Sequence, residues 1–273
     1  MTEIHRVEGR RAFGSDPLCY HDARPGYPEE VFDILQQRCG LRPGARTFEI
    51  GSGTGLCTRR LIELGSCPLV AIEPDERLAE FLTRTLVPTA PSLEIRVAAF
   101  EHINLPVEWF DLGTSASAFH WLDEMNSLHK IARSLREGGW WAMWWNLLLD
   151  GSRTDEFDQA TRMLFKDLGR SPSRGSGNGS FALDSETRIA NLAAVKAFEK
   201  IQSDSFSWTA LYDTAGIQRL YSTFSSISRL KEDQRQQLLD DLGEIAEKQF
   251  GGQVEIRITT PMYTAQRARY ASR

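Results

Sequence analysis

The chain has 273 residues, long enough to bury one large α/β core or one core that carries a smaller inserted cap. Hydrophobic residues make up 41% and charged residues 25%, a balance typical of a globular protein and unlike that of a disordered chain. The formal net charge is -5, and Lys and Arg form no long run, so the composition disfavours nucleic acid as a partner.

Membrane insertion, secretion and metal binding are disfavoured as well. No apolar run approaches the roughly 18–20 residues that span a bilayer. The basic residues of positions 1–14 are not followed by an apolar stretch, so we expect no signal peptide. Neither the histidines nor the four cysteines have the spacing of metal ligands, and no C-x-x-C pair occurs. These observations predict a cytoplasmic protein with reduced thiols, no metal and no membrane association, either a monomer or a homodimer.

Strands and helices alternate through the first half of the chain. A polar arm broken by prolines runs to about Pro28, and a helix follows with Glu29 in its first turn and Gly40 as an expected left-handed cap. Such alternation favours a parallel sheet covered by helices on both faces. The predicted strands are 46–50, 69–73, 93–98, 111–115 and 140–146, and the predicted helices are 56–64, one from an N-cap at Asp75 to Leu86, and 125–135.

The character of the sequence changes after Asn146. We expect helices at 154–168, 184–200 and 232–249, a flexible loop at 171–180, and strands near 206–208 and at 254–263. An insertion here is expected to fold as a cap over the open end of the sheet. The predicted organisation is a core with an N-terminal lid arm at 1–150, a helical cap insertion at 151–203, and a C-terminal part at 204–273 that completes the sheet.

A glycine-rich turn follows the first predicted strand. It reads G-x-G-x-G at Gly51, Gly53 and Gly55, and it lies where a doubly wound sheet binds its ligand. Glycines let the backbone approach a ligand closely. The spacing differs from the dinucleotide pattern G-x-G-x-x-G, because position 56 is Leu, and no P-loop pattern occurs. Glu49 opens the turn, and it suits the ammonium group of an amino-acid ligand better than a pyrophosphate.

Glu73 ends the second predicted strand, about 22 residues after Gly51. A carboxylate at this place accepts hydrogen bonds from ribose hydroxyls in nucleotide-binding sheets. The turn and the acid together predict a ligand that carries a ribose.

At these motifs the sequence resembles class I methyltransferases that depend on S-adenosylmethionine (SAM). The segment 49–55 is similar to their acidic glycine motif, 99–101 to the segment that lines the adenine, and 110–121 to their fourth motif. The resemblance implies a Rossmann-like, seven-stranded, mostly parallel sheet, with SAM as the cofactor. The implied cofactor-binding residues are Glu49, Gly51, Ser52, Gly53, Gly55, Glu73, Pro74, Ala99, Phe100, Glu101 and Ser117.

A narrower likeness points to the small-molecule branch related to trans-aconitate methyltransferases. Phe13, Tyr20 and 24–28 look like its N-terminal signature, and 118–121 looks like its substrate-side signature, with weaker likeness at 221–224. The expected partner is a small-molecule methyl acceptor, methylated at O, N or C.

Two features depart from the family pattern. Gly113 lies inside the fourth predicted strand, where it packs nothing. The fifth strand carries Trp140, Trp141, Trp144 and Trp145, which we expect to be core residues more than a ligand platform.

His120 is the candidate general base. It follows the fourth strand, at the rim where an acceptor is expected, and imidazole titrates near neutral pH. The alternative is that His120 only shapes the pocket by packing or hydrogen bonding. A base is needed only when the nucleophile must lose a proton, which a carboxylate does not.

Four further residues are candidates for acceptor binding. Trp121 either stacks on the acceptor or walls the site, and Asn146 either bonds a ligand or caps a turn. Tyr20 and Arg24 lie in the arm, where Arg24 either pairs with a carboxylate or is an ordinary surface arginine.

A macromolecular methyl acceptor is a further possibility, which the acidic net charge disfavours. Two other functions also remain open from the sequence. One is a SAM-binding protein without methyl transfer, and the other is an NAD-dependent oxidoreductase on a similar sheet, which the glycine spacing disfavours.

Overall fold

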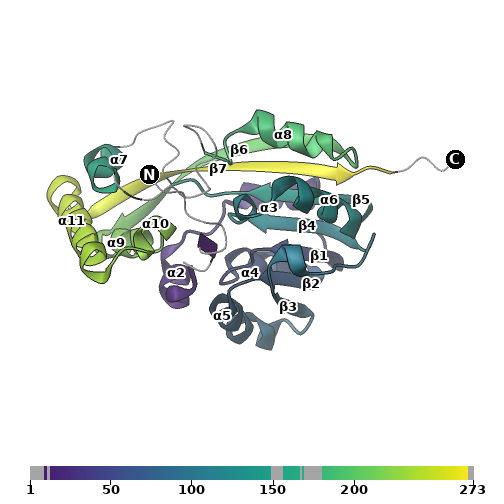
Figure 1. Ribbon diagram of the computed structural model, residues 1–273, viewed down its shortest axis with the longest axis horizontal. Helices are drawn as coiled ribbons and strands as arrows, with labels where there is room; N and C mark the ends of the chain where they lie inside the picture. Colours follow the sequence, from purple (N-terminus) through teal and green to yellow (C-terminus); the bar gives the residue numbers. More distant parts are fainter. Residues whose placement is uncertain (1–8, 11–12, 149–155, 167, 169–179, 270–273) are drawn as a thin grey trace. The chain divides into compact units, whose positions relative to one another are not determined.

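The structure is a computed structural model that describes residues 9–10, 13–148, 156–166, 168 and 180–269. Its Cα positions divide into two compact units (Figure 1). Unit 1 comprises Met1–Pro25, Leu147–Phe181 and Ser207–Thr259, and unit 2 comprises Gly26–Asn146, Ala182–Phe206 and Thr260–Arg273. The boundaries predicted at 150 and 203 for a cap insertion stay predictions.

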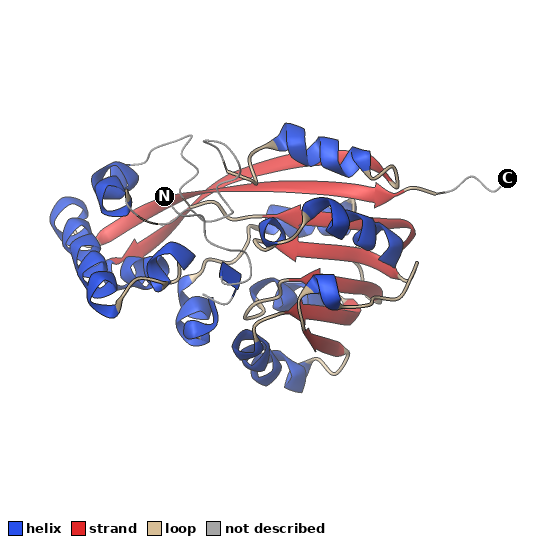
Figure 2. Ribbon diagram, viewed as in Figure 1, coloured by secondary structure: helices blue, strands red, loops and turns tan. Residues whose placement is uncertain are grey.

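Seven strands form one sheet in the order β3-β2-β1-β4-β5-β7-β6. The pairs among β1 to β5 are parallel, and β7 runs antiparallel to β5. Figure 2 shows β1 to β5 side by side with helices around them. The predicted seven-stranded, mostly parallel α/β fold is therefore confirmed. The strands are β1 Ala45–Ile50, β2 Ser66–Glu73, β3 Leu93–Val97, β4 Phe110–Ala116, β5 Leu135–Trp144, β6 Phe198–Asp213 and β7 Gln253–Arg267.

Aspartate side chains cap α5, α6 and α8 of unit 2. Asp75, Asp123 and Asp184 each accept a hydrogen bond from a backbone N–H in the first turn of the following helix. Asp75 therefore has the capping role that the sequence predicts. The helices of unit 2 are α3 Glu29–Gln37, α4 Leu56–Glu63, α5 Glu76–Leu86, α6 Glu124–Ser134 and α8 Ser185–Ala194.

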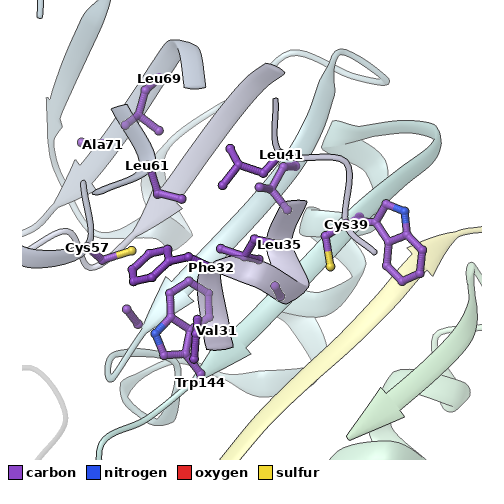
Figure 3. Packing of buried hydrophobic residues seen from close by; sticks show 14 of the residues in the cluster. Val31, Phe32, Leu35, Cys39, Leu41, Cys57, Leu61, Leu69, Ala71 and Trp144 are labelled. Atoms are coloured by element: carbon purple, nitrogen blue, oxygen red, sulfur yellow. The ribbon is translucent and has the colours of Figure 1, made fainter. Parts of the chain in front are cut away.

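One face of the sheet in unit 2 is covered by α3, α4 and α5. Their apolar residues share one core with alternate residues of β2, β4 and β5. Figure 3 shows Val31, Phe32 and Leu35 of α3 beside Trp144 of β5 and Leu61 of α4. Spacings of three and four residues along α3 bring these side chains onto one stripe.

Aromatic rings meet over Gly113. This glycine pairs with Phe48 of β1 on one side and with Trp141 of β5 on the other. The two rings lie 6.3 Å apart and nearly parallel, and a Cβ on Gly113 would stand 2.3 Å from Cζ of Phe48. The sequence-based view that Gly113 packs nothing is therefore corrected, because the missing side chain makes room for Phe48.

The four tryptophans predicted in the fifth strand are all buried, as expected of core residues, although β5 ends at Trp144 and Trp145 follows it. Trp140, Trp141, Trp144 and Trp145 have exposed fractions of 8%, 0%, 0% and 2%.

Unit 1 has its own hydrophobic core. The helices of this unit are α2 Pro17–Ala23, α7 Glu156–Thr161, η5 Arg162–Phe165, α9 Thr214–Ser222, α10 Ser225–Ser228 and α11 Glu232–Phe250. The core includes the fully buried Ile217, Leu220 and Leu242. Helix α11 lies where the sequence predicts a helix, at 232–249, whereas α9 and α10 were not predicted.

Several predicted boundaries were wrong for local reasons. The arm is not uniformly irregular, since Asp16 caps α2 and Pro17 occupies its first turn, where proline is tolerated. The helix predicted at 184–200 ends at Ala194, because Lys196 is left-handed (φ 60°) and Phe198 already begins β6. The helix predicted at 154–168 is α7 followed by a 3-10 turn, and most of the loop predicted at 171–180 lies outside the described residues.

Candidate functional site

The glycine turn follows the carboxyl end of β1 and packs against the segment after β4. Gly51, Gly53 and Gly55 all have positive φ, of 73°, 56° and 90°. A Cβ on Gly51 would stand 2.3 Å from Cβ of Ala118, whereas a Cβ on Gly53 would meet nothing within 4 Å. Gly51 therefore serves close packing within the protein, and Gly53 borders open space.

Glu73 is held beside this turn by backbone donors. Its carboxylate accepts hydrogen bonds from Gly53 N at 2.8 Å and from Asp75 N at 2.9 Å. The residue is only 4% exposed, and burial raises the pKa of its carboxyl to about 7 against the opposing effect of the two N–H groups. Each carboxylate oxygen keeps a further lone pair for a donor from a ligand.

Glu49 lies below the turn at the end of β1. It is 1% exposed, and the Thr58 hydroxyl donates to its carboxylate at 2.6 Å. Burial raises the pKa of Glu49 to about 7 as well. An ammonium group or another donor brought close to this carboxyl would favour its ionised form.

The ends of β4 and β5 are joined through Ser117, which has an unusual left-handed backbone (φ 55°). Its hydroxyl accepts from the Tyr27 hydroxyl at 3.2 Å and from Asn146 N at 3.3 Å. The Asn146 side chain donates to Gly26 O at 2.7 Å and accepts from the Thr260 hydroxyl at 2.8 Å. Asn146 thus fastens the chain before α3 to this rim, and its predicted role in acceptor binding stays a prediction.

The segment after β3 is fixed from α6. Phe100 in η3 Phe100–His102 is buried and stacks on Phe48 at 6.5 Å, while Glu101 is exposed. The Lys130 ammonium donates to Phe100 O and to Glu101 O, and it lies 4.6 Å from the centre of the Phe100 ring. Ala99 and Pro74, also predicted near the cofactor, are half-buried at neighbouring strand ends.

His120 and Trp121 lie in η4 Phe119–Trp121, directly after β4, and both are buried. The indole N–H of Trp145 donates to Nδ1 of His120 at 3.0 Å. Trp121 is 5% exposed, and its ring centre lies 5.0 Å from that of His120.

Tyr20 and Arg24 belong to unit 1. The Arg24 guanidinium donates to the hydroxyl of Thr223 at 2.8 Å and to its carbonyl oxygen at 3.2 Å, and it lies over the rings of Phe224 and Tyr20. The N-terminal signature at 24–28 and the segment of weaker likeness at 221–224 are therefore in contact through Arg24 and Thr223. A role of Tyr20 or Arg24 in acceptor binding stays a prediction.

The turn has the features that a close ligand requires. The Ser52 hydroxyl is buried without a hydrogen-bond partner among the described residues, and the open space at Gly53 is a place that a Cβ would fill. A buried hydroxyl of this kind is costly unless a ligand or water completes its bonding. The residues therefore fit a cofactor with polar groups lying along the turn.

Within the described ranges, no group of three or more His, Cys, Asp or Glu is arranged to hold a metal ion. Searched over the same residues, the helices include none long and apolar enough to cross a membrane. The four cysteines are free thiols.

Comparisons with known proteins agree with this geometry. Residues 48–143 match the model of a family described as a methyltransferase domain. An uncharacterized methyltransferase of Schizosaccharomyces pombe is 26% identical over 94% of this chain and 97% of the relative. One from Mycobacterium tuberculosis is 34% identical, over 50% of this chain and 52% of its own length.

A solved structure has a similar fold at low sequence identity. Phosphoethanolamine N-methyltransferase 2 of Haemonchus contortus, in complex with phosphomonomethylethanolamine and S-adenosylhomocysteine, superposes with a TM-score of 0.59. It is 12% identical, and the match covers 97% of this chain and 59% of that one.

The methyltransferase-domain match spans the glycine turn, Glu73 and the segment after β4 together. The protein is an enzyme, a methyltransferase. Its cofactor is SAM, as the sequence motifs predicted.

Three contacts at the site were not foreseen from the sequence. They are the bond from Tyr27 to Ser117, the bonds from Lys130 to the segment after β3, and the bond from Trp145 to His120. Tyr27 belongs to the N-terminal signature at 24–28, so the family likeness could have pointed to it. Lys130 had no such signal, because the carbonyl groups that it contacts lie about 30 residues away in the sequence.

Proposed function

We propose that this methyltransferase methylates a small organic acceptor at O, N or C, in the manner of the branch related to trans-aconitate methyltransferases. SAM, when bound, supplies the methyl group, which moves by in-line displacement. The protein aligns the two reactants and excludes water from between them. The net charge of -5 supports a small molecule over a nucleic acid.

The contact between Gly51 and Ala118 carries the proposal. It joins the glycine turn to the segment that leads into His120 and Trp121. An acceptor held at that segment would lie beside a cofactor held at the turn, as a direct transfer requires.

The proposed cofactor residues share one edge of the sheet. Glu73 would accept from the ribose hydroxyls, and Glu49 would face the methionine end. Ala99, Phe100 and Glu101 would line the adenine. The remaining contacts would come from Gly51, Ser52, Gly53, Gly55, Pro74 and Ser117, and Trp121 would wall the acceptor side.

Mass spectrometry of an extract of the source organism, incubated with the protein and deuterium-labelled SAM, tests the proposal. A labelled small molecule, heavier by three mass units and dependent on the enzyme, is the expected result, and it identifies the acceptor. Label found only in protein or nucleic acid would contradict the small-molecule proposal. Binding of SAM without any labelled product would favour a protein that uses SAM for another purpose.

A further inference from the structure

His120 and Trp145 form a buried polar pair between two neighbouring parallel strands. His120 follows β4 and Trp145 follows β5, and their exposed fractions are 7% and 2%. The hydrogen bond from Trp145 Nε1 to His120 Nδ1 measures 3.0 Å. A bond of this length between buried groups is of ordinary strength, and its direction is fixed by chemistry.

An indole N–H can only donate a hydrogen bond. Nδ1 of His120 must therefore offer its lone pair to Trp145 and carry no proton. A neutral imidazole has one N–H, so the proton lies on Nε2. Turning the ring over would place a carbon atom against the indole N–H, so the contact with Trp145 also selects the ring orientation.

Trp145 is itself held in place. Its backbone N–H donates to Pro261 O at 3.2 Å, and its ring meets the edge of the Tyr263 ring at 6.3 Å. The Tyr263 hydroxyl is anchored to Ala182 O at 2.7 Å. The indole is thus packed against fixed neighbours, and the tautomer of His120 is imposed by the fold.

We propose that His120 serves as a hydrogen-bond donor through Nε2, directed at a lone pair of the methyl acceptor, and not as a general base. Trp145 is the positioning residue that selects this tautomer. The proposal rests on the proposed function, because it assumes that the segment after β4 receives the acceptor.

The proposal restricts the chemistry of the acceptor. An imidazole with Nε2 protonated and Nδ1 engaged has no lone pair with which to take a proton from a nucleophile. The acceptor must therefore arrive with its attacking lone pair already available, and it must also present an atom that accepts a hydrogen bond. A nucleophile that needs His120 to remove its proton is excluded.

Nitrogen NMR on the full-length protein with 15N-labelled histidine tests the tautomer directly. The signal of His120 is identified among the five histidines by its loss in the His120→Gln variant. At a pH where the ring is neutral, we expect a proton on Nε2 and a bare, hydrogen-bonded Nδ1. A proton on Nδ1, or a rapid mixture of both tautomers, would overturn the proposal. The measurement needs neither SAM nor acceptor, so calorimetric titration with SAM reports separately on the proposed function.

Variants at two neighbouring tryptophans test the positioning role. Trp145→Phe keeps an aromatic ring but removes the donor, and we expect the Nδ1 shift to change and the second tautomer to appear. Trp144→Phe is the matched control, since the Trp144 indole N–H is buried without a hydrogen-bond partner among the described residues. The control should leave the His120 signals unchanged. An unchanged tautomer in folded Trp145→Phe would show that Trp145 does not select the tautomer of His120.

The rate of label transfer from deuterated SAM to small molecules of the extract separates a donor from a base. Gln retains an N–H donor near the position of Nε2 but accepts no proton. His120→Gln should keep the rate within about tenfold of the wild type, whereas loss of a general base costs roughly 10²- to 10⁴-fold. His120→Ala, which removes the donor, should fall at least about tenfold. A His120→Gln rate as low as that of His120→Ala and more than 100-fold below the wild type would contradict the donor role.

Discussion

Two carboxylic acids at the ends of β1 and β2 are removed from water by the fold. Glu49 has the Thr58 hydroxyl as a partner, and Glu73 has two backbone N–H groups. These donors only partly offset the cost of burial, since the pKa of each carboxyl remains at about 7. The free enzyme therefore carries two carboxyls that a ligand with N–H and O–H donors would stabilise in their charged form.

The pKa of Glu49 predicts how stability depends on pH. Its value in the folded state, about 7, lies above the ordinary value of 4.5, so folding favours the protonated form. The penalty for ionising Glu49 is absent below pH 4.5, grows between pH 4.5 and 7, and is complete above pH 7. Without SAM, Glu49→Gln should therefore gain stability relative to the wild type as pH rises through this window.

Urea denaturation at several pH values between 4.5 and 8 measures the difference between variant and wild type. Glu80→Gln, on the exposed side of α5, is the control, and its difference from the wild type should not depend on pH in this way. A difference for Glu49→Gln that is flat with pH would contradict the argument.

At the scale of elements, the packing of β1, β4 and β5 depends on the lack of a side chain at Gly113. Gly113 lets Phe48 and Trp141 approach over β4. Lys130 on α6 has a comparable role for the segment after β3, because its ammonium holds two consecutive carbonyl groups.

Gly113→Ala is expected to lower the free energy of unfolding by about 1–3 kcal/mol, because the new methyl group collides with the Phe48 ring. Gly26→Ala is the matched control, since a Cβ there meets nothing within 4 Å. Urea denaturation of both variants measures the effect. Equal stability of the two variants would show that Phe48 moves aside freely.

Lys130→Met should weaken SAM binding while leaving the protein folded. The variant keeps the apolar stem over Phe100 but loses the ammonium that fixes Phe100 O and Glu101 O. An indirect effect of this kind is worth about 0.5–2 kcal/mol, or roughly 2- to 30-fold in Kd. Calorimetric titration with SAM measures it, with Arg133→Met, exposed on the same helix, as the control. An unchanged Kd would show that the segment after β3 does not contribute to SAM binding.

On the scale of the whole molecule, the chain builds two compact units with separate hydrophobic cores. All proposed cofactor residues belong to unit 2, and Tyr20 and Arg24 belong to unit 1. Ligand binding to the folded state stabilises a protein by mass action. A cofactor that binds the turn should therefore protect the enzyme against unfolding.

SAM at about 100 times its Kd should add about 2.7 kcal/mol to the stability of the unit that binds it. The same concentration of NAD should add nothing, because the turn lacks the third glycine of a dinucleotide site. Scanning calorimetry with each ligand compares them. Stabilisation by NAD and not by SAM would be incompatible with the cofactor assignment.

The sequence by itself determined the alternation of strands and helices from β1 to β5, the glycine turn and the acid after β2. These follow from local periodicity, from caps such as Asp75, and from motifs a few residues long. The long strands β6 and β7 and the helices α9 and α10 were missed or shortened, because tertiary packing decides where such elements begin and end. Only the tertiary structure showed why Gly113 lacks a side chain and which group donates to Nδ1 of His120. Both answers depend on residues far apart in the sequence, Phe48 and Trp145, that the fold brings within contact distance.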